Sequence, residues 1–264
     1  MIDTRRGRFV RSIGGLRGVA GALVDETRDL VFTSNRGADT IGVFTPDREQ
    51  ERMTIEVGAR PNGLAFAPDL GILLCAHVGD PKAPGPRTVA LVDVSRCARI
   101  DDIVVPGRTR WTVYDERRGV FFVNVADPAV IAVVDPRSRT VVEQLAVPDR
   151  GPHGLDIDGA RRTLACACDG GTLARLDCDT GALRGSLALS GAPDVIFLDR
   201  ARERLYVAIG DPGVVDVIDT AAWRRVETVT TEPGAHTLAL DEGAHRIYVF
   251  LPGTHRASVF DDEA

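Results

Sequence analysis

The chain has 264 residues, of which 44% are hydrophobic and 27% charged, and its formal net charge is −6. A single β-rich domain is often this long, so the length does not require a second domain. The acidic balance argues against the basic surface with which proteins hold nucleic acids or anionic membranes. No stretch approaches the 18 apolar residues that a transmembrane helix needs.

The N-terminal residues 1–15 carry four arginines but no apolar stretch of secretory length behind them. The five cysteines are odd in number and contain no C-x-x-C pair, which favours a reduced protein. We therefore expect a cytoplasmic protein whose partner is a small-molecule substrate rather than a nucleic acid or a membrane. The sequence leaves the oligomeric state open.

One seven-residue motif recurs six times along the chain, at intervals of 41 to 48 residues. This interval is the period of a four-stranded propeller blade. Each copy is an apolar strand that begins with a polar or small residue and, in five of the six copies, ends in Asp. The copies are Val19–Asp25, Pro61–Ala67, Thr109–Asp115, Pro152–Asp158, Pro193–Asp199 and Ala235–Asp241.

Every copy of the motif is followed by the same succession of short segments. A turn rich in Asp, Arg and Gly leads into a second β-branched strand, such as Leu30–Asn35 or Val120–Val125. A third strand follows, and repeats one to five add a more polar fourth strand, such as residues 139–147. No window of a dozen residues has a helical apolar period, so the pattern predicts strands throughout.

The last repeat ends after its third strand, whereas residues 8–13 precede the first repeat and have no blade of their own. Pairing residues 8–13 with the last blade would complete that blade and remove an exposed sheet edge. The sequence therefore predicts an all-β protein, a six-bladed β-propeller that forms one domain over residues 1–264. Its ring is closed by the N-terminal strand.

The first residues of the six inner strands are expected to surround one mouth of the central channel, by analogy with other propellers. A purely structural repeat would place similar residues there, but five of the six are polar: Ala20, Asn62, Arg110, His153, Asp194 and His236. Three of the polar residues, His153, Asp194 and His236, come from consecutive blades. Two imidazoles and a carboxylate suit a divalent ion such as Fe, Zn or Mn.

Two further residues are candidates for catalysis. Arg110 faces the predicted metal ligands from across the channel, where a guanidinium would hold an anionic group. His77 ends a second strand beside the insertion Gly79–Arg87 and would serve as an acid or a base, with the insertion as a lid or as surface decoration. The alternative for each candidate is structural, because His and Asp at strand starts often bind loop backbone. The repeated turn aspartates, among them Asp169, are explained as turn formers.

Several runs are similar to known propeller families. VFTSNRGADTIGVFT, VFFVNVADPAVIAVVD and GPHGLDIDGARRTLACA resemble the blade signature of the YVTN family of β-propellers. RPNGLAFAPD is similar to a segment of the senescence-marker and gluconolactonase type of lactonases, in which the Asn is a ligand of a divalent metal. This resemblance implies that Asn62 is a metal ligand.

Two functions remain open at the level of sequence. One is a metal-dependent small-molecule enzyme, a hydrolase, lyase or isomerase acting on a polar, anionic metabolite in the channel. The other is a non-catalytic YVTN-type propeller that binds a small ligand or a protein partner.

Overall fold

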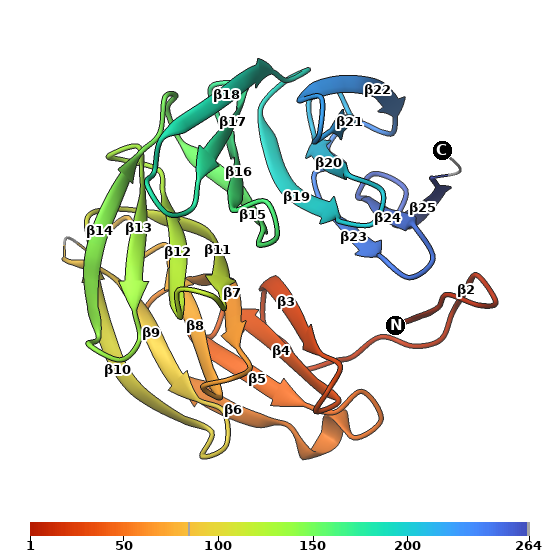
Figure 1. The fold of residues 1–264 in the computed structure, drawn as a ribbon. Helices are drawn as coiled ribbons and strands as arrows, with labels where there is room; N and C mark the ends of the chain where they lie inside the picture. The colour runs from red at the N-terminus through yellow and green to blue at the C-terminus, as the bar shows by residue number, and fades with distance from the viewer. Residues whose placement is uncertain (84, 263–264) are drawn as a thin grey trace.

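Six antiparallel sheets, each built from consecutive strands, lie around a common axis in the computed structural model (Figure 1). The structure describes residues 1–83 and 85–262. Strand order within each of these sheets follows the order along the chain. The predicted six-bladed β-propeller is therefore confirmed. Pro84 of the predicted lid loop and the last two residues of the predicted domain lie outside the described residues.

The first three blades have four strands each. They are β3 (Val19–Asp25), β4 (Leu30–Asn35), β5 (Thr40–Phe44) and β6 (Met53–Glu56); β7 (Pro61–Ala67), β8 (Ile72–His77), β9 (Arg87–Asp93) and β10 (Ala98–Val105); β11 (Thr109–Asp115), β12 (Val120–Val125), β13 (Val130–Asp135) and β14 (Thr140–Ala146). The predicted inner strands of these blades coincide with β3, β7 and β11.

The other three blades follow the same plan, although the last has only three strands. They are β15 (Pro152–Asp158), β16 (Thr163–Cys168), β17 (Thr172–Asp177) and β18 (Leu183–Ala188); β19 (Pro193–Asp199), β20 (Arg204–Ile209), β21 (Val214–Asp219) and β22 (Arg224–Thr230); β23 (Leu238–Asp241), β24 (Arg246–Leu251) and β25 (Arg256–Asp261). Only the sixth inner strand differs from the prediction, because β23 begins at Leu238 rather than at Ala235.

The turn between the first two strands has one conformation in all six blades. Its last residue has a positive φ, near +50° to +70°, a region that L-residues rarely adopt. In the third blade this residue is Gly119, whereas in the fourth it is Arg162. In the five blades whose inner strand ends in Asp, this aspartate accepts a backbone N–H bond inside the turn, as Asp115 does from Arg117 at 3.2 Å. The repeated Asp, Arg and Gly of the sequence are thus the residues of an Asx-type turn.

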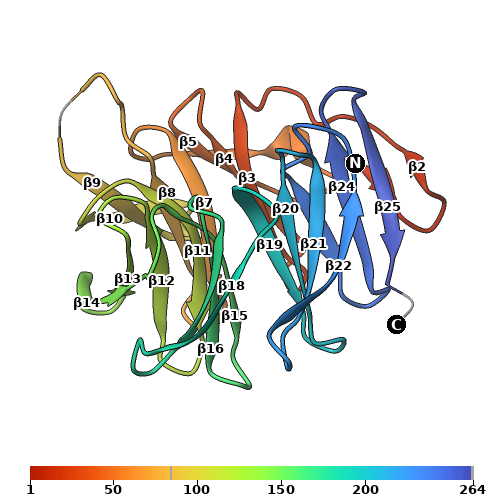
Figure 2. The same cartoon turned by 90° about the horizontal axis from the view of Figure 1, so that it is seen from above.

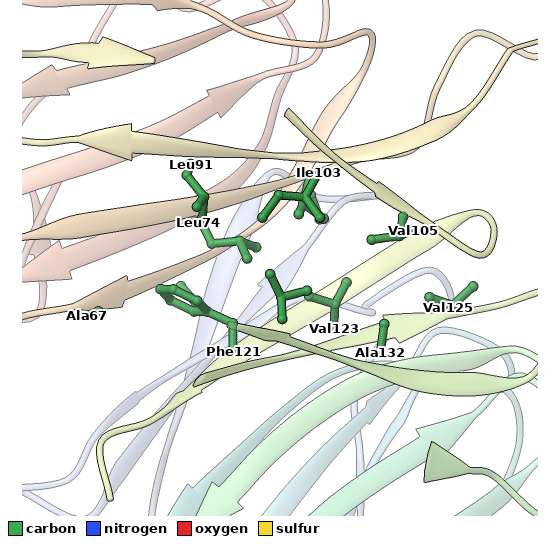
Figure 3. Close-up of a cluster of buried hydrophobic side chains, with 13 residues drawn as sticks. Ala67, Leu74, Leu91, Ile103, Val105, Phe121, Val123, Val125 and Ala132 are labelled. Carbon is green, nitrogen blue, oxygen red and sulfur yellow. The ribbon is translucent and has the colours of Figure 1, made fainter. Parts of the chain in front are cut away.

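The hydrophobic core lies between neighbouring blades. Figure 3 shows one such layer, where Leu74, Leu91 and Ile103 of the second blade pack against Phe121 and Val123 of the third. The middle strands are buried on both faces, which explains their continuous apolar sequences. All five cysteines are free, and four of them are buried in these layers, as expected of small hydrophobic residues. Among the described residues, no helix is long and apolar enough to cross a membrane.

The N-terminal segment lies at the junction of the last blade and the first in both views (Figures 1 and 2). Its strand β2 (Arg8–Phe9) pairs with β1 (Ile2–Asp3) in a small hairpin, and within residues 1–83 and 85–262 the last sheet has three strands. A cavity of about 430 Å³ lies between the outer strands of the fifth and sixth blades, lined by Val226 and Val229 on one side and Phe260 on the other. Closure of the ring by residues 8–13 stays a prediction.

Hydrogen exchange tests this closure. If residues 8–13 pair with β25, alternate amides of both segments are expected to exchange slowly, because an antiparallel pair protects every second N–H on each edge. The same experiment on a chain lacking residues 1–13 is expected to show fast exchange along the outer edge of β25. Fast exchange of this edge in the full-length chain would contradict the closure.

Candidate functional site

A β-bulge marks the start of each of the first five inner strands. The pairing of β7 with β8 shifts between Pro61 and Leu64, that of β11 with β12 between Thr109 and Thr112, and β3, β15 and β19 have corresponding shifts. A bulge leaves residues out of the ladder and turns their side chains in a new direction. The predicted site residues of these strands occupy the bulges, and the polar side chains of the third, fourth and fifth blades meet in the channel mouth.

His153 is the centre of this group. Its Nδ1 lies 2.7 Å from a carboxylate oxygen of Asp169, and its Nε2 lies 3.1 Å from Oδ1 of Asp194. Arg110 contacts both His153 and Asp169. One guanidinium nitrogen lies 3.3 Å from the carboxylate of Asp169, and another lies 3.3 Å from Nε2 of His153. The structure thus brings together Arg110, His153 and Asp194 of the predicted residues, and adds Asp169. These four residues are called the His153 cluster below.

The charges of the cluster are set by its hydrogen bonds. Burial opposes protonation of His153, but the bonds to Asp169 and Asp194 outweigh it and raise the pKa of His153 above its ordinary value. Burial would raise the pKa of both aspartates, but the bond to His153 lowers each of them on balance. The two carboxylates therefore stabilise the imidazolium form of His153. In that form both His153 nitrogens donate to carboxylates and Arg110 contacts Nε2 without a hydrogen bond, whereas in the neutral form Nε2 can accept from Arg110.

Trp111 forms the floor beneath the cluster. It follows Arg110 in the bulge of β11, and its side chain packs against the core between the third and fourth blades and also against the core between the fifth and sixth. Its indole N–H lies 3.5 Å from Oδ1 of Asp194. The indole therefore reaches across the channel from the third blade to the fifth.

His236 lies at the edge of the cluster. Its side chain is 53% exposed, its Nε2 is 3.8 Å from Asp194, and its Nδ1 is 2.6 Å from the carbonyl oxygen of Gly234. The segment before β23 is not a strand, so His236 is not fixed by a ladder as His153 is. This residue approaches the predicted group without joining its hydrogen bonds.

The predicted metal ligands do not form a ligand set in this arrangement. A dication on Nε2 of His153 would lie against the guanidinium of Arg110, and the fourth predicted ligand, Asn62, accepts a hydrogen bond from Arg36 through its amide oxygen. Over residues 1–83 and 85–262, no group of three or more His, Cys, Asp or Glu side chains has the geometry of a metal site. The chemistry proposed below therefore uses the side chains alone.

His77 lies away from the channel. It is only 1% exposed; its Nε2 accepts the backbone N–H of Gly58 at 3.2 Å, and its Nδ1 lies 2.9 Å from the hydroxyl of Thr88. Burial, and then the charge of Arg99, lower the pKa of His77 to about 4. A neutral imidazole with both nitrogens engaged fastens the connection between the first and second blades. The structure does not bring it to the predicted site.

Asp169 is the residue that the sequence interpretation missed. The CDGG turn in which it occurs matches the turns of the other repeats, so its carboxylate was explained as a turn former. The signal that would have found it is its place directly after β16, which puts it at the same mouth as His153. Its backbone N–H donates to Gly151 at 2.9 Å, which leaves the carboxylate free to bind His153.

No family model matches the sequence, and no curated protein matches it. Among solved structures, the chain is similar to Kuenenia stuttgartiensis hydrazine synthase, with a TM-score of 0.66 at 14% identity over 98% of this chain and 99% of that one. It is also similar to a chain of a mitotic checkpoint complex, with a TM-score of 0.83 at 10% identity over 99% and 81% of the two chains.

A third similar structure is a functionally unknown protein from Desulfotomaculum acetoxidans, with a TM-score of 0.74 at 12% identity over 93% of this chain and 83% of that one. Identities this low show the fold and no more. The chain is thus a six-bladed β-propeller by structural likeness, while its resemblance to YVTN propellers and lactonases stays a prediction.

Proposed function

We propose that the protein acts on a small anionic molecule at the mouth of its central channel, with His153 as the proton donor. One observation supports this most: an imidazole oriented on both sides by carboxylates, at 2.7 Å and 3.1 Å, with a guanidinium beside it. Carboxylates on both sides stabilise the protonated form of such a histidine and fix the directions of its N–H bonds.

The chemistry that suits this arrangement is general acid catalysis. His153 would turn its Nε2–H from Asp194 to a substrate oxygen that gains negative charge and protonate it, while Asp169 holds the ring from Nδ1 and Arg110 binds an anionic group of the substrate. Hydrolysis, elimination and isomerisation all include such a step. With its pKa lowered, Asp194 is a poor base, so it serves to orient His153 and Trp111 rather than to take up a proton.

A non-catalytic propeller is the second candidate, and a specific observation favours it. The two positive and two negative charges of the His153 cluster balance one another, and the cluster links the third, fourth and fifth blades. A ligand-binding or structural network of this composition needs no reaction. Loss of His153 would strongly reduce turnover if the protein is an enzyme, and would affect only ligand binding or stability if it is not.

Histidine NMR and turnover assays on wild type, His153→Gln and His255→Gln separate these candidates. His255 is exposed on a turn and serves as the matched control. We expect His153 to titrate above pH 6.5 in the wild type, and a panel of lactones and carboxylate and phosphate esters to include a substrate. His153→Gln is expected to reduce its turnover by about 10²–10⁴-fold, the usual contribution of a general acid.

Unchanged turnover in His153→Gln would contradict the catalytic proposal. Binding of panel members without any turnover in the wild type would instead support the non-catalytic candidate. The assays are run with and without EDTA, because a loss of activity on chelation would support the predicted divalent metal.

A further inference from the structure

A second group of charged residues surrounds the same mouth on the side of the first three blades. Arg60 and Arg108 directly precede the inner strands β7 and β11, and their carbonyl oxygens accept equivalent backbone bonds, from Val78 at 3.0 Å and from Ala126 at 2.8 Å. These equivalent bonds place the two arginines at the same height on adjacent blades. Arg36 follows β4 and reaches across to the second blade, where it donates to Asn62.

Carboxylates act on these arginines only from a distance, Asp194 on Arg36 and Asp169 on Arg108. Over residues 1–83 and 85–262, the structure shows no salt bridge of Arg36, Arg60 or Arg108 with an acidic side chain. Asp39 is close to Arg60, but its carboxylate accepts a hydrogen bond from the backbone N–H of Arg60, at 2.7 Å, and not from the guanidinium group. The Nε atoms of Arg36 and Arg110 are buried and have no hydrogen-bond partner.

Electrostatics agrees with this geometry. Burial, followed by the charges of Arg60, Arg110 and Arg108, lowers the pKa of Arg36, and burial followed by the charges of Arg110 and Arg60 lowers that of Arg108. Guanidinium groups that repel one another in a half-buried mouth raise the local positive potential. Such a group is stabilised by an anion that accepts from several of them at once.

We infer that Arg36, Arg60, Arg108 and Arg110 bind a phosphoryl group. This inference rests on the proposed function and specifies it: the molecule that His153 acts on would be a phosphate monoester. A monocarboxylate would neutralise only one of the guanidinium groups. A phosphate monoester carries nearly two negative charges and three acceptor oxygens. It can therefore accept hydrogen bonds from several guanidinium groups at once.

The distribution of charge also orients the ligand. Asp169, which pairs with Arg110, and Asp194 belong to the fourth and fifth blades, and Glu232 lies in the loop before the last blade. These groups repel a phosphoryl group, so it stays with the arginines on the first three blades. The uncharged part of the molecule would then extend over Trp111 toward His153.

Tryptophan fluorescence reports binding at this place. The chain has two tryptophans, and Trp223 packs in a different core layer, beneath Arg175. In a Trp223→Phe background the signal comes from Trp111 alone. The probes are inorganic phosphate, methyl phosphate, dimethyl phosphate and acetate at constant ionic strength. We expect both phosphate dianions to bind at least tenfold more tightly than acetate or the diester, with methyl phosphate tighter than free phosphate.

Two matched double variants test the residues. Arg60→Gln with Arg108→Gln is expected to weaken methyl phosphate binding at least tenfold. Arg48→Gln with Arg96→Gln removes the same charge from side chains that are 72% and 82% exposed, and should change binding less than twofold.

The outcomes separate this inference from the proposed function. Equal binding of acetate and methyl phosphate, or equal losses in the two double variants, would overturn the inference and leave the role of His153 open to its own assay. Tighter binding of free phosphate than of methyl phosphate would overturn the monoester assignment. Loss of methyl phosphate binding in Arg60→Gln with Arg108→Gln but not in the control pair, with no turnover by the wild type, would contradict the proposed function and leave the phosphoryl site intact.

Discussion

Replacing Arg162 by alanine is expected to lower the free energy of unfolding by about 3–5 kcal/mol. Its guanidinium makes two bonds to Asp115, at 2.8 Å and 2.6 Å, and two to Asp179, at 3.1 Å and 2.6 Å. Asp115 ends the inner strand of the third blade and is 2% exposed, while Arg162 belongs to the fourth. Removal of the arginine leaves a buried carboxylate without its partner, in a contact that joins two blades.

Denaturant unfolding measures this effect, and a neighbour provides the control. Arg161 binds Asp158 and Glu203, but its side chain is 37% exposed, so Arg161→Ala should cost less than about 1 kcal/mol. Adding Asp115→Asn to Arg162→Ala should restore part of the lost stability, because a neutral amide is less costly to bury than an unpaired carboxylate. A loss of similar size in both single variants would contradict the buried-pair explanation.

Acid is expected to destabilise the protein through His77. The folded state takes up the His77 proton only near pH 4, whereas an unfolded chain takes it up near pH 6.5. Since the pKa is lowered on folding, the contribution is fully present above pH 6.5 and is lost as the pH falls toward 4. The difference corresponds to about 3 kcal/mol. A second proton on Nε2 would face the N–H of Gly58, which donates to that nitrogen.

A comparison of wild type with His77→Gln isolates this contribution. Glutamine retains an acceptor for Gly58 but does not titrate, so the stability difference between the two proteins should narrow by about 3 kcal/mol between pH 6.5 and pH 4. His255→Gln, on an exposed turn, should run parallel to the wild type over the same range. A stability difference that stays constant with pH would show that His77 titrates normally and is not buried as described.

The blade arrangement was predictable because each blade repeats the same local chemistry. Five of six inner strands have the predicted bounds, since the apolar run recurs at a fixed distance before a turn whose last residue has a positive φ. The sixth differs because the segment around His236 lacks the ladder that fixes its counterparts. The pairing of the N-terminal segment with the last blade was predicted by counting strands. A count of strands does not reveal that Arg8–Phe9 can instead pair with Ile2–Asp3 in a hairpin.

The candidate site was predictable only where it follows the repeat. Arg110, His153 and Asp194 share one position in the motif, and the structure brings them together. His77 ends β8 in the register position of Cys168 and turns into the interior, whereas Asp169, one position further along in its own repeat, reaches the channel. Side-chain direction at such positions depends on the neighbouring blade, which the repeat does not encode.

The position of the Trp111 indole affects how small molecules enter and leave the central channel. A ring that reaches across the axis would make the channel a blind well, and the substrate and product of the proposed reaction would then share one entrance. Product departure would have to precede the next arrival, and a bulky product would inhibit competitively. Shortening this side chain is the direct way to open a second exit toward the opposite face.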